Sequence, residues 1–338
     1  MIMKRRTYLI ICLCLALVFS CAKVPPTGKN DDAKTYLDAW IKVNHPDAVT
    51  TELGAFKLSE TPGSGVPAAD SLYLRINYSY YTLDEELVAT TYEKVARRCG
   101  TYKKNAWYGP SIIWRGQNKD NLAAGLEEAV NSMNVGGKMR VVIPGWLSTT
   151  KRYANAEEYL AKATGTDYIY DIEIVDALND TEVWERDSLR RFIEANYPGA
   201  KEDSTGFWSV VLSDPHPDSV IPADTTLQIN YTGRLLNGRV FDTTIADTAA
   251  RHGIYSSSKT YATQRINWFS SSENWDKITM GTDSGSLIAG FKYGLSLMHK
   301  GEKALFFFTS SYGYGANGSG SSIPGYSPLC FELEITEE

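Results

Sequence analysis

The sequence is poor in the side chains that most often bind transition metals, since its 338 residues include only five cysteines and four histidines. No two histidines have the H-x-H or H-x-x-x-H spacing of a metal site. Beyond residue 21 only Cys99 and Cys330 remain, in different halves of the chain, which does not suggest a disulfide framework. We therefore expect no metal site and no cofactor, and we expect Cys330, within the alternating stretch "LCFELEI", to be buried.

The sequence also lacks a cluster of basic residues, and its formal net charge is −6. Nucleic acids and anionic membrane surfaces bind proteins through such clusters, so we expect no nucleic-acid partner. Aromatic residues, in contrast, make up 12% of the chain and include 21 tyrosines and eight tryptophans. That composition favours β-structure with amphipathic pockets.

Only one long apolar run is present, over residues 8–19, and three basic residues precede it. The run is too short to span a bilayer and is typical of a signal peptide. It ends in "VFSC", which resembles a bacterial lipobox with Cys21 as the modified residue. The resemblance implies a signal peptide at 1–20, lipidation of Cys21, a polar tether at 21–34 and a lipid-anchored place in the bacterial cell envelope, facing the periplasm or in the outer membrane. An ordinary signal peptide with an incidental cysteine is the alternative.

Beyond residue 34 the chain contains the same pattern twice. The matched pairs, in chain order, are "YLDAWIKVNHP" with "SLRRFIEANYP", "YLRINYSYY" with "TLQINYTGR", "NLAAGLEEAVNSMNVGGKM" with "SLIAGFKYGLSLMHKGEKA", and "DYIYDIEIVD" with "PLCFELEITE". Because the matches keep their order, the sequence predicts two tandem domains, at 35–177 and 178–338.

The pattern of each copy predicts a first amphipathic helix that ends at Asn-x-Pro. Short strands of alternating apolar and polar residues and a second helix follow. The second helix has one apolar stripe in each copy: Leu122, Leu126, Val130 and Met133, or Leu287, Phe291, Leu295 and Met298. Gly136 and Gly301 stand where a helix C-terminus favours a left-handed residue. Few helices and mostly antiparallel strands indicate an α+β fold.

The second copy resembles the FKBP-type peptidyl-prolyl cis-trans isomerases over about residues 206–338. The stretches that carry the resemblance are "INYTGRLLNGRVFD", "LIAGFKYGLSLMHKGEK", "YGYGANG" and "IPGYSPLCFELEI". The resemblance implies a curved antiparallel sheet wrapped around one short helix, with an apolar pocket between them. Together with the repeat, it predicts two tandem FKBP-like domains, each preceded by an extra amphipathic helix.

The resemblance also implies which residues form the pocket. The catalytic set would be Tyr231, Phe241, Asp242 and Tyr314, and the substrate-binding set would be Leu287, Ile288, Phe291, Ile323 and Phe331. Rotation about an X-Pro bond crosses a barrier of roughly 18–20 kcal/mol and needs no nucleophile. A dry aromatic pocket favours the twisted, less polar amide, and a tyrosine hydroxyl can hold the substrate carbonyl. We expect Asp242 to orient neighbouring hydroxyls rather than to transfer protons.

The predicted function is therefore proline isomerisation by the C-terminal domain, acting on proline-containing unfolded or exported polypeptides. In the first copy, Val88 and Ala89 stand where the second has Phe241 and Asp242. We expect the first copy to be non-catalytic, either a spacer or a chaperone-like peptide-binding surface. The alternative for the whole protein is a non-catalytic peptide-binding or chaperone lipoprotein on the same scaffold.

A long polar insert at about 243–280 departs from the family pattern. It could extend the edge of the sheet, cover the pocket, bind a partner or form a passive surface loop. Trp275 stands near the position of a family aromatic residue just before "KITMG".

Two other motifs suggest different chemistry. Gly313–Gly318 matches G-x-G-x-x-G, but no helical pattern follows to hold a phosphate, so we expect these glycines to let the chain turn and direct Tyr314 into the pocket. Fragments around His252 and Ser284 resemble serine-protease motifs, but the glycine after Ser284-Gly285 is missing. We therefore do not expect a catalytic triad.

Overall fold

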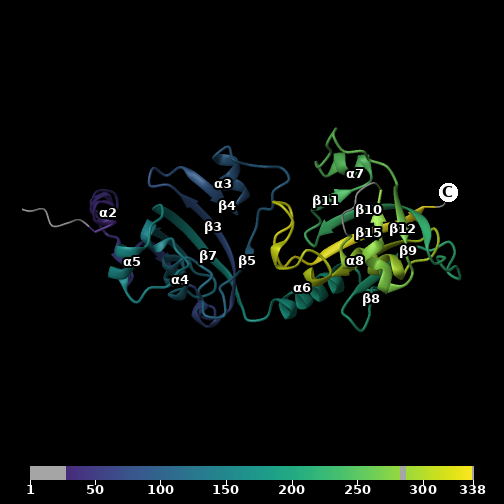
Figure 1. Ribbon diagram of the computed structural model, residues 1–338, viewed down its shortest axis with the longest axis horizontal. Coiled ribbons are helices and arrows are strands. Elements are labelled where there is room, and N and C mark those ends of the chain that lie inside the picture. The colour runs from purple at the N-terminus through teal and green to yellow at the C-terminus, as the bar shows by residue number, and fades with distance from the viewer. Residues whose placement is uncertain (1–27, 282–286, 337–338) are drawn as a thin grey trace, which may run out of the picture.

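The computed structural model describes residues 28–281 and 287–336 (Figure 1). The predicted signal peptide, Cys21 and Ser284 lie outside the described residues. The described chain forms a first half (28–178) and a second half (179–336) that lie side by side along the long axis, each built on one antiparallel sheet (Figure 1). The prediction of an α+β fold is confirmed.

The first sheet has the strand order β1-β2-β6-β7-β3-β4, with β5 also pairing with β3. Its strands are β1 (Val49–Thr50), β2 (Phe56–Thr61), β3 (Tyr73–Tyr81), β4 (Leu87–Thr90), β5 (Ser111–Trp114), β6 (Lys138–Ile143) and β7 (Tyr168–Leu178). Strand β7 ends one residue beyond the predicted domain boundary at 177.

The second sheet has the order β13-β12-β10-β15-β14-β9-β8, with β11 also pairing with β10. Its strands are β8 (Lys201–Glu202), β9 (Trp208–Ser213), β10 (Thr225–Leu235), β11 (Val240–Thr243), β12 (Gln264–Trp268), β13 (Thr279–Met280), β14 (Lys303–Phe308) and β15 (Leu329–Thr336). Apart from β13, each strand has a counterpart in the same place of the first sheet.

Two longer helices precede the sheets, α2 (Asp31–Asn44) and α6 (Thr181–Asn196). Both end at the asparagine of the predicted Asn-x-Pro stop, whose side chain donates a hydrogen bond back to the carbonyl of Trp40 or Phe192. Helix α2 starts earlier than predicted, because residues 31–34 of the expected tether are helical. The two acidic residues of its first turn lie at the positive end of the helix dipole and favour this start.

Shorter helices pack on the sheets: α3 (Glu93–Arg98), α4 (Ala124–Asn131), α5 (Ala156–Lys162), α7 (Ala246–Arg251) and α8 (Ala289–Ser296). Helices α4 and α8 are shorter than their apolar stripes predicted, so the first and last stripe residues flank them, yet still pack in the core. Gly136 and Gly301 have the predicted positive φ, 84° and 70°, but lie beyond the helix ends in the turns to β6 and β14.

Each half has its own apolar core, and α6 belongs to the second half. Leu189 and Ile193 of α6 pack with Leu305, Phe307 and Cys330 on the face of the second sheet that points away from α8. Cys330 is buried as predicted, and burial raises the pKa of its thiol to about 12. Among the described residues, none of the helices combines the length and the apolarity needed to cross a bilayer.

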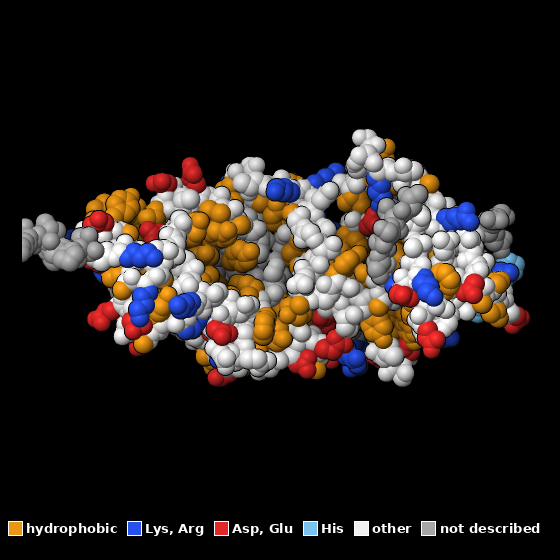
Figure 2. Space-filling view, in the orientation of Figure 1, with side chains coloured by type: hydrophobic (Ala, Val, Ile, Leu, Met, Phe, Trp, Pro, Cys, Tyr) orange, Lys and Arg blue, Asp and Glu red, His pale blue; other side chains and the backbone are white. Residues whose placement is uncertain are grey.

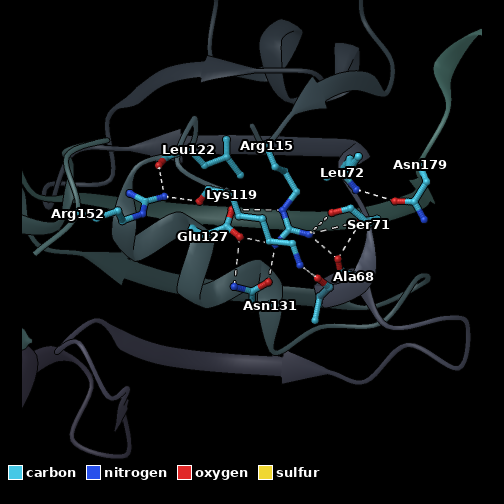
Figure 3. A network of polar contacts seen from close by, with 11 residues as sticks. Ala68, Ser71, Leu72, Arg115, Lys119, Leu122, Glu127, Asn131, Arg152 and Asn179 are labelled. Atoms are coloured by element: carbon cyan, nitrogen blue, oxygen red, sulfur yellow. Dashed lines mark hydrogen bonds and ion pairs between the residues drawn. The ribbon is translucent and has the colours of Figure 1, made fainter. Parts of the chain in front are cut away.

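The first half contains a buried ionic network between β5 and α4. Arg115 is fully buried and pairs with Glu127, while its guanidinium also donates to Asn131 and to the carbonyls of Ala68 and Ser71 (Figure 3). The distances from Nη1 to the two carbonyl oxygens are 2.5 and 2.8 Å. One side chain therefore ties a strand end, the 3₁₀ helix η1 (Ala68–Asp70) and α4 together.

Candidate active site

A tyrosine and an aspartate face each other across β10 and β11. Asp242 pairs with Gly233, so its side chain lies near Tyr231, two residues before Gly233 on β10. The Tyr231 hydroxyl donates a hydrogen bond of 2.7 Å to Asp242 Oδ2. The amide of Thr243 donates to Oδ1 at 2.9 Å. The carboxylate is therefore held as an acceptor and orients the tyrosine hydroxyl, as the sequence predicted.

Two buried aromatic rings, those of Phe291 and Phe331, form a dry wall behind this pair. Phe291 of α8 lies edge-on to Tyr231, with ring centroids 5.5 Å apart, and edge-on to Phe331 of β15 at 5.6 Å. Phe291 and Phe331 are only 2% and 4% exposed. Edge-to-face packing at these separations is favourable beyond the area it buries. The wall is therefore rigid as well as apolar.

Phe241 and Tyr314 complete the aromatic set. The Phe241 ring lies over Gly233, where a Cβ atom would come within 2.5 Å of it, so only glycine leaves room for the ring. The centroid of the Phe241 ring lies 5.6 Å from that of Phe331 and 6.5 Å from that of Tyr314, and both ring pairs have edge-to-face geometry. Burial, and then the charge of Asp242, raise the pKa of Tyr314. Its hydroxyl thus stays protonated and able to donate a hydrogen bond.

The remaining predicted residues are aliphatic and join the same cluster. Ile288 caps α8, Leu287 precedes it, and both are partly buried against the core of the second half. Ile323 is 3% exposed. The structure thus brings all the residues predicted for the pocket into one apolar cluster, with the Tyr231–Asp242 pair as its polar contact.

The glycine-rich segment before Ile323 is not a phosphate-binding loop. It forms two 3₁₀ turns, η4 (Ser310–Tyr312) and η5 (Gly315–Asn317), and no helix follows it in the described residues up to 336. Gly318 has a φ of 62°, and a Cβ atom there would lie 2.1 Å from the carbonyl oxygen of Ile323. The glycine therefore lets the chain fold back on itself and carry Tyr314 and Ile323 to the same pocket.

The insert at 243–280 contains α7, β12, the 3₁₀ helix η3 (Ser272–Lys277) and β13. Of the roles that the sequence left open, extension of the sheet edge is what the structure shows, because β12 pairs with β10 and β13 with β12. Trp275 packs against Trp268 and Tyr293, with centroids 6.3 and 6.4 Å away.

Sequence reasoning missed two polar residues at the mouth of the pocket. Lys259, from the insert, forms an ion pair with Asp242. Asn105 comes from the first half and lines a cavity of about 180 Å³ beside the same aspartate. The other lining residues are Arg239, Val240, Phe241, Asp242, Ile254, Ser256, Lys259, Tyr261 and Ser322. No local pattern distinguishes Lys259 or Asn105 from other polar loop residues.

A histidine and two carboxylates meet elsewhere in the second half. Ligand atoms of Asp214, His299 and Glu302 lie within 4.8 Å of one another. His299 Nδ1 is 2.8 Å from Asp214 Oδ2, and this hydrogen bond raises the pKa of the imidazole. The cluster could hold a cation, but its polar atoms already bond to one another. His252 is exposed at the end of α7, and its suggested partner Ser284 lies outside the described residues.

Comparison with known proteins places residues 218–336 in the family described as FKBP-type peptidyl-prolyl cis-trans isomerase. A probable FKBP-type peptidyl-prolyl cis-trans isomerase of Haemophilus influenzae is 29% identical over 137 residues, which are 40% of this chain and 44% of that protein. FK506-binding protein 1A of Aspergillus fumigatus is 35% identical over 107 residues, 32% of this chain and 71% of that protein.

Among solved structures, a peptidyl-prolyl cis-trans isomerase of Pseudomonas syringae is 24% identical and covers 48% of this chain and 98% of its own, with a TM-score of 0.31. The chain spans less than half the length of the Haemophilus relative. The matched stretch contains every residue of the predicted pocket.

Proposed function

Because the chain belongs to the FKBP-type peptidyl-prolyl cis-trans isomerase family, we propose that its second half catalyses cis-trans isomerisation of X-Pro bonds. The observation that supports this most is the Tyr231–Asp242 hydrogen bond of 2.7 Å set into a wall of buried aromatic rings. The pocket presents an oriented polar pair and an apolar surface. Rotation about an amide bond needs such groups to hold the substrate and stabilise the twisted amide, and it needs no nucleophile.

The mechanism follows from the polarity of the amide. A planar amide is more polar than one twisted out of resonance, so the dry wall of Phe291 and Phe331 favours the twisted form. The rings of Phe241 and Tyr231 hold the prolyl ring, while the protonated Tyr314 hydroxyl donates to a substrate carbonyl. Asp242 fixes the Tyr231 hydroxyl. Stabilising the twisted amide by about 5 kcal/mol would accelerate rotation by between three and four decades.

We also infer that the two halves are tandem copies of one FKBP-like domain, at about 35–177 and 178–338, each preceded by its helix α2 or α6. The shared strand order supports this. The first copy lacks the aromatic–carboxylate set, because Ala89 occupies the place of Asp242 in the matching register. We propose that it is non-catalytic.

We further propose that the protein is a lipoprotein anchored through Cys21 in the bacterial cell envelope, where it acts on exported proline-containing polypeptides. The lipobox-like "VFSC" and the basic and apolar residues before it support this. Several acyl chains on one cysteine would anchor the protein stably, where a single chain binds only marginally.

Non-catalytic peptide binding is the second candidate, and a feature of the first half favours it there. The Tyr80 ring stacks on that of Tyr170 with centroids 5.2 Å apart and lies edge-on to that of Tyr168 with centroids 5.3 Å apart. The Tyr78 ring also lies next to that of Tyr80. These partly exposed rings lie on β3 and β7, and hydrophobic side chains gather over this sheet in Figure 2. Tyrosine surfaces of this kind bind extended polypeptides at low entropic cost.

Measuring proline isomerisation in a short peptide with the full chain tests the proposal. We expect acceleration by the unmutated protein, and a large loss of kcat/KM in Asp242→Ala and in Tyr314→Phe. Asp84→Ala, which replaces an exposed aspartate of the first half, is the matched control and should retain full activity. No acceleration by the unmutated chain would refute the isomerase and favour the binding role.

A further inference from the structure

The segment between α3 and β5, residues 99–110, belongs to the first half but reaches the pocket of the second (Figure 1). The amide of Trp107 donates to the carbonyl of Ser321 at 2.6 Å. Arg239 donates to the carbonyl of Lys104 at 3.0 Å and to that of Ala106. The segment is thus tied both to the loop that carries Tyr314 and to the turn between β10 and β11.

A third contact comes from the side chain of Lys104. It lies so close to Gly253, just after α7, that a Cβ atom there would be 2.1 Å from Lys104 Cε. The segment therefore contacts Arg239, Ser321 and Gly253, which either line the cavity beside Asp242 or adjoin residues that line it.

The segment is braced internally. The rings of Tyr102 and Tyr108 stack at 5.4 Å, and the amide of Lys103 donates to the Tyr108 hydroxyl at 3.0 Å. The guanidinium carbon of Arg97 lies 3.5 Å from the centre of the Tyr102 ring. A preformed shape of this kind lowers the cost of ordering a binding surface.

The second half contains an equivalent segment, residues 255–261, with the same internal contacts. Tyr255 and Tyr261 stack at 5.1 Å, and the amide of Ser256 donates to the Tyr261 hydroxyl at 2.9 Å. That segment delivers Lys259 to Asp242. Two equivalent segments, one from each half, therefore line the same cavity, one through Asn105 and the other through Lys259 and Tyr261.

We propose that residues 104–107 of the first half are an outer wall of the catalytic pocket, and that Asn105 binds the backbone of the substrate next to its proline. This inference rests on the proposed isomerase function. The Asn105 carboxamide both donates and accepts hydrogen bonds, which matches a peptide group. The charges of Asp242 and Lys259 pair with each other, and the Arg239 guanidinium donates to the carbonyls of Lys104 and Ala106, so the cavity suits an uncharged, extended stretch of chain.

The kinetic consequence is a defect in binding rather than in the chemical step. Loss of one hydrogen bond in Asn105→Ala should raise KM by about two- to tenfold, with kcat unchanged, because the contact serves ground state and transition state equally. Asn105→Trp, which fills the cavity, should raise KM further. Lys103→Trp adds the same bulk on an exposed neighbour that does not line the cavity, and should leave both constants unchanged.

A labelling experiment provides a readout that needs no catalysis. In a chain whose other accessible cysteines are replaced by serine, Asn105→Cys and Lys103→Cys are alkylated with and without an excess of a proline-containing peptide. Cys330 stays silent because it is buried and its pKa is raised. We expect the peptide to slow alkylation at position 105 and not at position 103.

The two measurements separate this inference from the function on which it rests. An unmutated chain without activity, whose position 105 is still protected, would refute the isomerase and keep the wall as a peptide-binding surface. If the unmutated chain is active but the Asn105 and Lys103 variants show the same KM and the same labelling, the proposal that residues 104–107 form a wall of the pocket is wrong and the isomerase function stands. Absence of both activity and protection would overturn both.

Discussion

The two halves share a scaffold and differ in what fills it. In both, the amide of the central tyrosine, Tyr78 or Tyr231, donates to a threonine hydroxyl, Thr91 or Thr244, at 2.9 or 3.0 Å. At the pocket the likeness stops, because Tyr80 stands where Gly233 makes room for Phe241. The Tyr80 ring stacks on Tyr170 instead. The backbone framework and the pocket chemistry are therefore separable properties of this fold.

The interiors differ in the same way. The first half buries the Arg115–Glu127 ion pair between β5 and α4. In the second half the corresponding strand ends in buried Trp268, and Lys292 of α8 donates to the carbonyl of Trp275. The first half thus pairs its buried cation with a carboxylate at a large desolvation cost, whereas in the second half the buried Lys292 ammonium donates to a backbone carbonyl.

Glu127→Ala should destabilise the first half strongly. It leaves the Arg115 guanidinium buried beside an empty space, which costs roughly 3–5 kcal/mol. Urea unfolding followed by tryptophan fluorescence should show the first half unfolding earlier, while isomerase activity in the absence of urea is kept. Exposed Glu157→Ala is the control. An unchanged unfolding curve for Glu127→Ala would show that the ion pair does not hold the first half together.

The stability of the second half should depend on pH through the carboxyl group of Glu185 in α6. This carboxyl is 1% exposed and accepts hydrogen bonds from the amide and hydroxyl of Ser310, at 2.5 and 2.7 Å. Burial raises its pKa to about 7 from an ordinary value of 4.5. The folded state therefore binds the proton more tightly, and the stability that this provides is lost as pH rises from about 4.5 through 7.

Glu185→Gln should remove that slope, and the free energy of unfolding measured between pH 5 and 8 checks it. The corresponding loop of the first half is held differently, since the amide of Gly145 donates to Asp167 at 2.7 Å. Asp167→Asn therefore serves as the matched variant and should leave the slope that comes from Glu185 in place. A slope that persists unchanged in Glu185→Gln would contradict the assignment.

Arg239→Ala should have the smallest effect, because it removes only the hydrogen bonds to the carbonyls of Lys104 and Ala106. We expect about 1–3 kcal/mol less coupling between the halves, seen by calorimetry as a wider separation of two unfolding transitions. Arg251→Ala, an exposed arginine of α7, is the control. Identical calorimetric traces for the two variants would mean that Arg239 does not join the halves.

Local patterns predicted much of this architecture. The helix ends at Asn44 and Asn196 follow from short-range motifs, the repeat follows from matching the two parts of the sequence, and the pocket cluster around Phe291 was predicted from the resemblance to the FKBP-type isomerases. The sequence could not predict that Arg115 is buried, that Lys259 pairs with Asp242 or that Asn105 lines the cavity beside it, because these features join segments that are distant in the chain and carry no periodic signal. The early start of α2 was missed because charged residues at a helix start resemble a polar tether.

Exchanging one residue between equivalent positions of the two halves tests most directly whether catalysis resides in the second half. Gly233→Tyr gives the second half the residue of the first, and Tyr80→Gly does the reverse. With folding verified by circular dichroism, Gly233→Tyr should lower kcat/KM by about a hundredfold or more, because the Phe241 ring is displaced. Tyr80→Gly should leave kcat/KM unchanged. Activity retained in Gly233→Tyr and lost in Tyr80→Gly would place the isomerase in the first half and contradict this assignment.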